Sequence, residues 1–236
     1  MSILSKLQNK NLGIFEILAM GYSLYFNNFR AFAILVCILL PFSIITDILA
    51  GYASINPSLL ILTAILSIFF GLFVVTIYTP AIAILVEDIV LNKETRVNVA
   101  LKQVVNRAFP LVKLNIRFFI NLYLRIFLFI IPGIIYSVNN IFYYVTYILR
   151  DQRGKSAFKY SSSLVKGNWW KVFFFSLLVS LNAFGALFFF HQIVSIFIPN
   201  YPIIVSIISS ILTFFFGVGI VISTVLLFLN LDFQKR

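Results

Sequence analysis

Long apolar runs separated by short polar segments make up most of the chain. Two of these runs, residues 59–86 and 203–231, contain no charged residue, and residues 31–53 are interrupted by a single aspartate. Residues 172–190 form a fourth run, in which Asn182 is the most polar side chain. A helix needs about 20 mainly apolar residues to cross a bilayer. The pattern therefore predicts four membrane-spanning helices.

The middle of the chain is also apolar, but it is broken. Residues 113–131 form one run and residues 134–149 another, and the dipeptide Pro132-Gly133 separates them. Proline lacks the amide proton and glycine tolerates any turn, so the dipeptide predicts a tight reversal between two short helices. This hairpin either crosses the membrane twice or is re-entrant. The predicted fold class is an all-α integral membrane protein with six transmembrane helices, or with four and one re-entrant hairpin.

Three segments on the predicted cytoplasmic side carry apolar residues at helical spacing, with polar residues on the opposite face: residues 14–29, 97–108 and 155–166. This pattern is typical of amphipathic helices that lie at the headgroup boundary. Each segment precedes a hairpin of apolar runs, which suggests a single membrane domain, residues 1–236, built from three tandem units. The alternative is that the segments are merely anchored helix ends. The predicted units cover approximately residues 13–86, 95–149 and 155–231.

Aromatic residues stand beside basic ones where two of the apolar runs begin, as is usual for interfacial anchors. The chain is expected to enter the bilayer at these positions. The predicted anchors are Phe29, Arg30, Trp169, Trp170 and Lys171.

Composition and charge agree with a membrane location. Of the 236 residues, 61% are hydrophobic, and a soluble domain of this length could not bury so much apolar surface. The formal net charge is +11, and the Lys and Arg residues flank the apolar runs, which favours contact with anionic lipid rather than nucleic acid. The loops at the opposite ends of the runs contain neither. Both termini are therefore predicted to be cytoplasmic, with Arg125 as the one basic residue left within the membrane.

Because thirty residues that include Glu16 precede the first run, we do not expect it to be a cleaved signal peptide.

Polar side chains within the middle runs are the candidate binding site. Arg117, Asn121 and Arg125 recur at four-residue spacing and so share one helix face. An arginine within a membrane is costly without partners or water, so this face could hold a lipid phosphate or an anionic substrate. The alternative is that Arg125 reaches toward the headgroups and the asparagines hold helices together. The hypothetical polar seam consists of Arg117, Asn121, Arg125, Asn139, Asn140 and Asn182.

Titratable residues form no catalytic, cofactor or metal pattern along the chain. His191, the one histidine, is far in sequence from any carboxylate, and Cys37 is the one cysteine. Glu87 and Asp88 follow an apolar run, where we expect a solvated helix end. Because acid–base and metal chemistry need clustered groups of this kind, the sequence predicts no enzyme, no cofactor and no metal site.

One stretch carries a resemblance to a known family. The sequence reads IPGII over residues 131–135, YILRD over residues 147–151 and SSSLVKGNWWKVF over residues 161–173. This stretch resembles the membrane domain attached to some bacterial glycerophosphodiester phosphodiesterases and the related YciC-like inner-membrane proteins. The resemblance implies a helical membrane fold in the bacterial cytoplasmic (inner) membrane. It does not imply phosphodiesterase activity, because that family's catalytic domain has no counterpart in this sequence.

Three functions are compatible with these features. The first is a non-enzymatic scaffold, or a lipid- or partner-interacting module, at the cytoplasmic leaflet, with anionic membrane lipids as partners. The second is transport, as a permease or as the membrane subunit of an exporter with an ATPase subunit as partner, which would need a water-lined path. The third is a membrane immunity or stress protein.

Overall fold

The structure, a computed structural model, describes residues 3–53, 56–94 and 96–235, and within these residues every regular element is helical. Arg236, predicted to be cytoplasmic, and residue 95, the predicted start of the second unit, lie outside the described residues. Four helical segments are long and apolar enough to cross a membrane, and each coincides with one of the four predicted runs. These segments are Phe29–Ala53, Pro57–Val90, Trp169–Phe197 and Pro202–Lys235.

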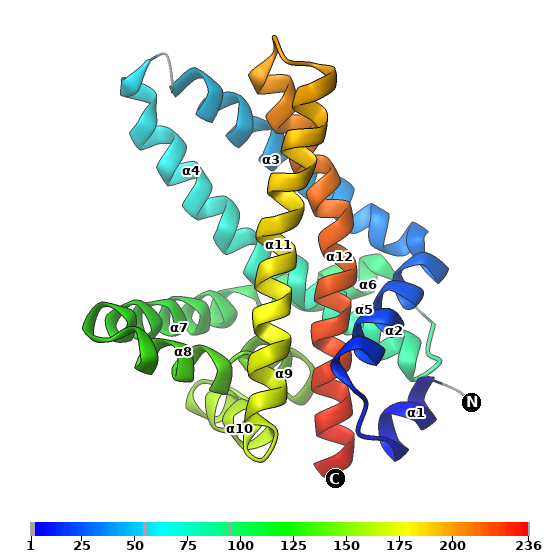
Figure 1. Ribbon diagram of the computed structural model, residues 1–236. Helices are drawn as coiled ribbons and strands as arrows, with labels where there is room; N and C mark the ends of the chain where they lie inside the picture. The colour runs from blue at the N-terminus through cyan, green and yellow to red at the C-terminus, as the bar shows by residue number, and fades with distance from the viewer. Residues whose placement is uncertain (1–2, 54–55, 95, 236) are drawn as a thin grey trace.

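The helices form two hairpins of long helices, one shorter hairpin and several short helices (Figure 1). The three segments predicted to be amphipathic are helical and correspond to α2, α6 and α10, whereas their relation as a repeat stays a prediction. In chain order, the elements are α1 (Ile3–Asn9), α2 (Ile14–Asn27), α3 (Phe29–Ala53), the 3-10 turn η1 (Pro57–Leu59), α4 (Leu60–Phe73), the π-helical turn η2 (Val74–Tyr78), α5 (Thr79–Val90), α6 (Val97–Asn106), α7 (Ala108–Leu128), α8 (Ile130–Asn139), α9 (Tyr143–Arg150), α10 (Lys155–Val165), α11 (Trp169–Phe197) and α12 (Pro202–Lys235).

The buried core lies at one end of the molecule, in a group of helices that we call the platform. The platform consists of α1, α2, α5, α6, α9, α10 and residues 218–235 of α12. Residues 222–232 of α12 are all buried, as are residues 80–86 of α5. They are buried because α12 contacts α1, α2, α5 and α10 on different sides.

The opposite end consists of two long hairpins, which we call the upper hairpins and define as residues 40–73 and 174–217. No residue of α4 is buried, and α11 buries only Val172, Phe175 and Val194. In Figure 1 α4 diverges from the paired helices α11 and α12, whereas α3 crosses α12 and contacts it. Apolar side chains exposed at this density fit hydrocarbon surroundings and not water.

The second apolar segment belongs to both regions. Its exposed part, α4, passes through the π-helical turn η2 into α5, which is buried in the platform. A π-helical turn inserts an extra residue and changes which face the following helix presents. The sequence predicts one continuous span here, and the structure keeps it continuous while dividing it between two surroundings.

The middle hairpin reverses three residues earlier than predicted. The break falls at Phe129, whose backbone is extended (φ −157°, ψ 134°). Pro132 instead lies in the first turn of α8, where its missing N–H group is not needed for the helix. Gly133 is required by close packing, because a Cβ atom there would lie 2.4 Å from Cγ1 of Ile126 on α7. The predicted turn at Pro132-Gly133 is therefore wrong, and the dipeptide serves helix entry and packing.

We call α7 and α8 the lateral hairpin, because in Figure 1 they extend to one side, across the direction of α11 and α12. Neither helix is among the four long apolar segments. The helix predicted over residues 134–149 is also divided, because α8 ends at Asn139 and α9 begins at Tyr143. α8 remains with α7, whereas α9 packs into the platform against α5 and α10.

Candidate anion-binding site

A buried ion cluster fixes the end of α9. The Arg150 guanidinium donates through Nη1 to Glu87 Oε1 at 2.5 Å and through Nε to Asp232 Oδ2 at 2.9 Å. The other carboxylate oxygen of Asp232 accepts a hydrogen bond from the Tyr160 hydroxyl. Only 11% of the Arg150 side chain is exposed, and none of the Asp232 side chain. The Arg150 guanidinium thus joins α5, α9 and α12, and the Tyr160 hydroxyl adds α10 through Asp232.

Pairing outweighs burial at Arg150. Burial alone would lower the pKa of the guanidinium, but the hydrogen bonds and charges of Glu87 and Asp232 act in the opposite direction and raise that pKa. Buried charges are tolerated only when their partners compensate the loss of hydration. The sequence-based expectation that Glu87 is part of a solvated helix end is therefore wrong, since its side chain is 17% exposed and ion-paired.

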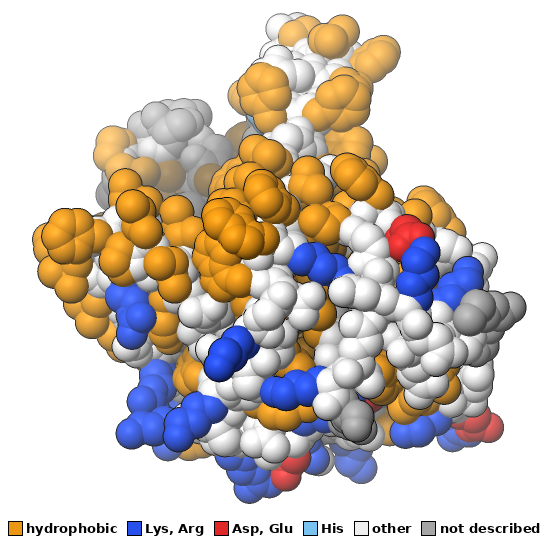
Figure 2. Space-filling view, turned by 60° about the horizontal axis from the view of Figure 1, so that its bottom comes forward, with side chains coloured by type: hydrophobic (Ala, Val, Ile, Leu, Met, Phe, Trp, Pro, Cys, Tyr) orange, Lys and Arg blue, Asp and Glu red, His pale blue; other side chains and the backbone are white. Residues whose placement is uncertain are grey.

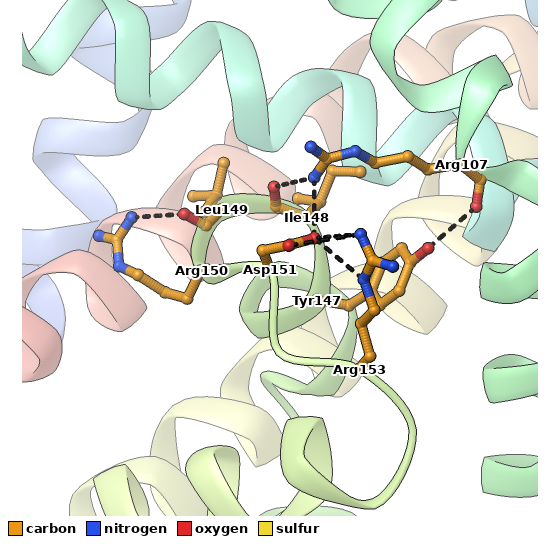
Figure 3. A network of polar contacts seen from close by, with 7 residues as sticks. All are labelled: Arg107, Tyr147, Ile148, Leu149, Arg150, Asp151 and Arg153. Carbon is orange, nitrogen blue, oxygen red and sulfur yellow. Dashed lines mark hydrogen bonds and ion pairs between the residues drawn. The ribbon is translucent and has the colours of Figure 1, made fainter.

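The chain reverses direction immediately after Arg150. Asp151 has left-handed backbone angles (φ 49°, ψ 28°), which end α9, and Gly154 also has a positive φ, of 56°. Figure 3 shows the result: Arg150 extends to one side of the turn, while Asp151 and Arg153 meet Arg107 on the other. The buried cluster therefore fixes the turn on one side, and Asp151 and Arg153 on its other side face Arg107 at the start of α7.

The second group is a loose ring of polar contacts. Arg107 Nη1 lies 3.6 Å from Asp151 Oδ1, and it donates to the Ile148 carbonyl at 3.4 Å. Arg153 approaches the same carboxylate at 3.4 Å, and the Tyr147 hydroxyl donates to the Arg107 carbonyl at 3.3 Å. Strong charge-assisted hydrogen bonds are shorter, about 2.7–2.9 Å. Asp151 thus orients the two arginines without engaging them fully.

This ring borders a cavity of about 390 Å³ at the base of α7, which we call the basic pocket. Four of its side chains are cationic, and they come from the α6–α7 junction, from α7 and from the turn after α9. Burial raises the pKa of Tyr147, although Arg107 and Arg153 oppose this effect, so the hydroxyl at the pocket stays protonated near neutral pH. The lining residues are Asn106, Arg107, Pro110, Lys113, Leu114, Arg117, Tyr147, Arg153 and Gly154.

A second buried network supports the wall of the pocket. Asn115 Nδ2 donates to Thr76 Oγ1 at 2.9 Å, and its Oδ1 accepts from the Tyr143 hydroxyl at 2.7 Å. Tyr143 also stacks on Phe118 of α7 with ring centroids 4.5 Å apart. Because Thr76 belongs to η2, Asn115 to α7 and Tyr143 to α9, this network fixes the base of the lateral hairpin against the platform.

The three seam residues predicted on α7 have different surroundings. Arg117 lines the basic pocket. Asn121 donates to the Arg117 carbonyl at 2.8 Å, a bond within its own helix. Arg125 lies over the ring of Tyr136, 4.3 Å from its centroid, so its partner is an aromatic ring of α8. Two helical turns separate Arg125 from Arg117, and only Arg117 contributes to the pocket.

The three seam asparagines outside α7 do not join Arg117 either. The backbone carbonyl of Asn139 accepts from Ser161 Oγ at 3.0 Å, and Asn140, which follows α8, donates to the Tyr136 carbonyl of that helix. Asn182 lies on α11 and donates to the carbonyl one turn before it. The six residues of the predicted polar seam therefore lie in different surroundings and do not form one site.

The predicted anchors divide into exposed and packed side chains. Trp170 is 66% exposed and Phe29 46%, and Arg30 is exposed as well, as expected at an interface. Trp169 is only partly buried and stacks on Phe173. Lys171 instead donates to Asn11 Oδ1 at 2.5 Å, a bond that ties the start of α11 to the platform.

The sequence alone predicts neither the buried cluster nor the pocket. The cluster combines Glu87, Arg150 and Asp232, which are separated by 63 and 82 residues. One signal was present, since each of these charges directly adjoins an apolar run. Such a position is ambiguous, because a charge at the end of a run is usually solvated.

Within residues 3–53, 56–94 and 96–235, no three His, Cys, Asp or Glu side chains are placed so that they could hold a metal ion. No protein-family model, no curated protein and no solved structure matches the chain.

Proposed function

We propose that this chain is a non-enzymatic membrane protein that retains anionic phospholipid at the cytoplasmic leaflet of a bacterial inner membrane. The observation that carries the proposal is the separation of charge from apolar surface. Figure 2 shows Lys and Arg side chains gathered over the lower part of the molecule and hydrophobic side chains crowded over the upper part. A basic end beside exposed apolar helices is suited to anionic headgroups.

The distribution of charge along the long helices supports a cytoplasmic platform. Arg30 lies at the start of α3, Lys171 at the start of α11 and Lys235 at the end of α12, all at the platform end. The connections at the other end, residues 54–58 and 198–201, contain neither Lys nor Arg. By the positive-inside rule, the platform and both termini are then cytoplasmic.

The lateral hairpin supports a re-entrant arrangement within the same leaflet. Its tip is strongly apolar and exposed, with Phe127 90%, Phe129 72% and Ile131 70% exposed. Such a tip favours hydrocarbon over water, while Lys113 and Arg117 at its base suit the headgroup layer. In this proposal the hairpin enters the cytoplasmic leaflet and returns, and the upper hairpins supply four full crossings.

Lipid retention is favoured over transport by the cavities along the long helices. One, of about 400 Å³, lies between α3 and α4 and is lined by apolar side chains and Thr46, and another along α11 has Asn182 as its one polar amide. Neither is lined by a charged side chain, so neither resembles a water-filled path. An exporter subunit with an ATPase partner, or an immunity or stress protein, gains no specific support.

The proposal predicts that the purified protein selects anionic lipid. After extraction into nanodiscs from a membrane of mixed composition, bound lipid is quantified by mass spectrometry at low and high salt. We expect phospholipids with net negative charge to be enriched over zwitterionic ones at low salt, with less enrichment at high salt because surface charges are screened. Lipid in the proportions of the source membrane at both salt concentrations would contradict the proposal.

The orientation is tested separately with single cysteines in a Cys37→Ala background. Phe129 is a better site than Gly133, because Gly133 has no room for a side chain beside Ile126. With an impermeant thiol reagent added outside, we expect Tyr201→Cys, in the α11–α12 connection, to be labelled and Phe129→Cys not to be. Labelling of Phe129→Cys from outside would show that the hairpin crosses the membrane completely.

A further inference from the structure

The basic pocket has more positive charge than its own carboxylate can balance. Arg107, Lys113, Arg117 and Arg153 line it, and Asp151 is the carboxylate that contacts Arg107 and Arg153. Four positive charges against one negative leave a surplus of three. Concentrated charge of one sign in a concave site attracts ligands of the opposite sign.

Within the described part of the chain, two of the four cations have no anionic partner, and the contact of Lys113 is with the Phe109 ring, 4.5 Å from its centroid. Among the described residues, neither Lys113 nor Arg117 has a carboxylate within ion-pair distance. The side-chain hydrogen bond and the ion pair of Arg107 both involve Nη1, which leaves Nε and Nη2 of its guanidinium for a ligand. Guanidinium groups bind phosphate oxygens through two parallel N–H bonds. The first turn of α7, which includes Pro110 of the pocket wall, adds the positive end of a helix dipole.

An exposed apolar stripe leads from the pocket along α7. Lys113 is followed at spacings of three and four residues by Ile116, Ile120, Tyr123 and Phe127, so all five share one helix face. The four that follow Lys113 are 44%, 54%, 66% and 90% exposed. From Lys113 to Phe127 the helix rises about 21 Å, at 1.5 Å per residue. The stripe therefore offers an apolar surface beside the pocket against which acyl chains can pack.

We infer that the basic pocket binds the phosphate monoester group of a membrane lipid, whose chains pack against the exposed apolar face of α7. This inference rests on the proposed function and specifies its ligand. A phosphate monoester carries a charge of about −1.5 to −2 near neutral pH, whereas the phosphate diester of an ordinary anionic phospholipid carries a single negative charge. The monoester therefore matches the surplus charge of the pocket better, and it offers one more unsubstituted oxygen to the guanidinium groups.

Binding is measured by native mass spectrometry and by lipid titration of the full chain in detergent micelles. The probes are phosphatidic acid as the monoester lipid, phosphatidylglycerol as the diester lipid, phosphatidylcholine and inorganic phosphate. We expect phosphatidic acid to bind about tenfold more tightly than phosphatidylglycerol, with no measurable binding of inorganic phosphate at the same concentrations. Tenfold corresponds to the loss of one charge-assisted contact.

Arg117→Gln and Lys113→Gln are each expected to weaken the binding of phosphatidic acid by about tenfold and so to remove its preference over phosphatidylglycerol. Both positions are exposed, so the fold is expected to persist. Lys102→Gln is the matched control, since Lys102 is an exposed base on α6 outside the pocket.

Equal binding of the two anionic lipids, with Arg117→Gln indistinguishable from Lys102→Gln, would overturn the inference. Tight binding of inorganic phosphate alone would overturn it too, because it would identify a site for a soluble ligand. In either case an enrichment of anionic over zwitterionic lipid in nanodiscs would leave the proposed function intact.

Discussion

The platform and the upper hairpins use their polar side chains differently. In the platform, polar side chains connect elements far apart in sequence: Arg150 reaches Glu87 and Asp232, and Asn230 donates to the carbonyls of Leu7 and Lys10 at 2.9 Å. In the upper hairpins, most polar side chains bond to a carbonyl of their own helix three or four residues earlier. Examples of the second kind are Ser43, Thr63, Asn182, Ser206, Ser209 and Thr213.

This difference has a physical cause. A hydroxyl or amide in hydrocarbon must find a partner, and the nearest carbonyl of its own helix is always within reach. Such a bond satisfies the group without fixing the position of a neighbouring helix. Asp47, which hydrogen-bonds Ser210 across the α3–α12 contact, is an exception. The platform is therefore expected to be a rigid unit held by specific bonds, and the upper hairpins to depend mainly on the bilayer.

The largest expected effect is the loss of the buried ion cluster. Arg150→Met keeps an apolar side chain of similar length but leaves the carboxylates of Glu87 and Asp232 together without their cation. Removing one partner of a buried ion pair costs about 3–5 kcal/mol. We expect a loss of this size in the free energy of unfolding, measured by steric trapping in bicelles.

Arg125→Met is the control in the lateral hairpin. Arg125 interacts with the ring of Tyr136 and has no ion pair among the described residues. A cation–π contact is worth about 0.5–1 kcal/mol at an exposed site. Equal losses for the two variants would mean that the buried ion cluster stabilises the platform no more than one cation–π contact stabilises the lateral hairpin.

A smaller effect is expected from adding one methyl group at the α2–α12 contact. A Cβ atom at Gly219 would lie 2.5 Å from the ring of Tyr22, whose hydroxyl donates to the Phe216 carbonyl and holds the ring in place. Gly219→Ala should therefore cost about 1–3 kcal/mol, as overpacking usually does. Gly185→Ala on α11 is the matched control, because nothing lies within 4 Å of its Cβ position. Thermal unfolding in detergent should separate the two variants, and a Gly219→Ala protein as stable as Gly185→Ala would show that α2 is not closely packed.

The four long helices and the three amphipathic ones were predictable because hydropathy and helical spacing are local properties of a sequence. The position of the reversal was not, because Pro132 and Gly133 suit the first turn of α8 as well as they suit a loop. Nothing in the sequence around Phe129 distinguishes these two uses. The difference depends on how closely α8 approaches Ile126.

The candidate site was predictable only in part. Arg117 was found because an arginine inside an apolar run is conspicuous. Arg107, Lys113 and Arg153 resemble ordinary flanking charges, and the fold alone brings them to the same cavity as Arg117. Their convergence depends on the left-handed turn at Asp151, which the Arg150 cluster holds in place.

The smallest expected effect concerns a polar contact at the solvent edge of the platform. The Glu16 carboxylate accepts from Lys10 Nζ at 2.6 Å and from the Gly13 amide at 2.8 Å at the start of α2. The hydrogen bond from Lys10, and next the one from Gly13, hold the pKa of Glu16 below its ordinary value of about 4.5. A carboxyl whose pKa is lower in the folded state stabilises that state above its unfolded pKa, and the contribution is lost as the pH falls through the folded pKa.

Wild type should therefore unfold at a slightly higher temperature than Glu16→Gln at pH 7, and the difference should shrink below about pH 4.5 and at high salt, because an exposed pair is screened. A difference in unfolding temperature that stays constant from pH 7 to pH 3 would contradict this, because it would indicate that Glu16 acts through side-chain packing and not through its charge. Packing would then stabilise even the exposed edge of the platform.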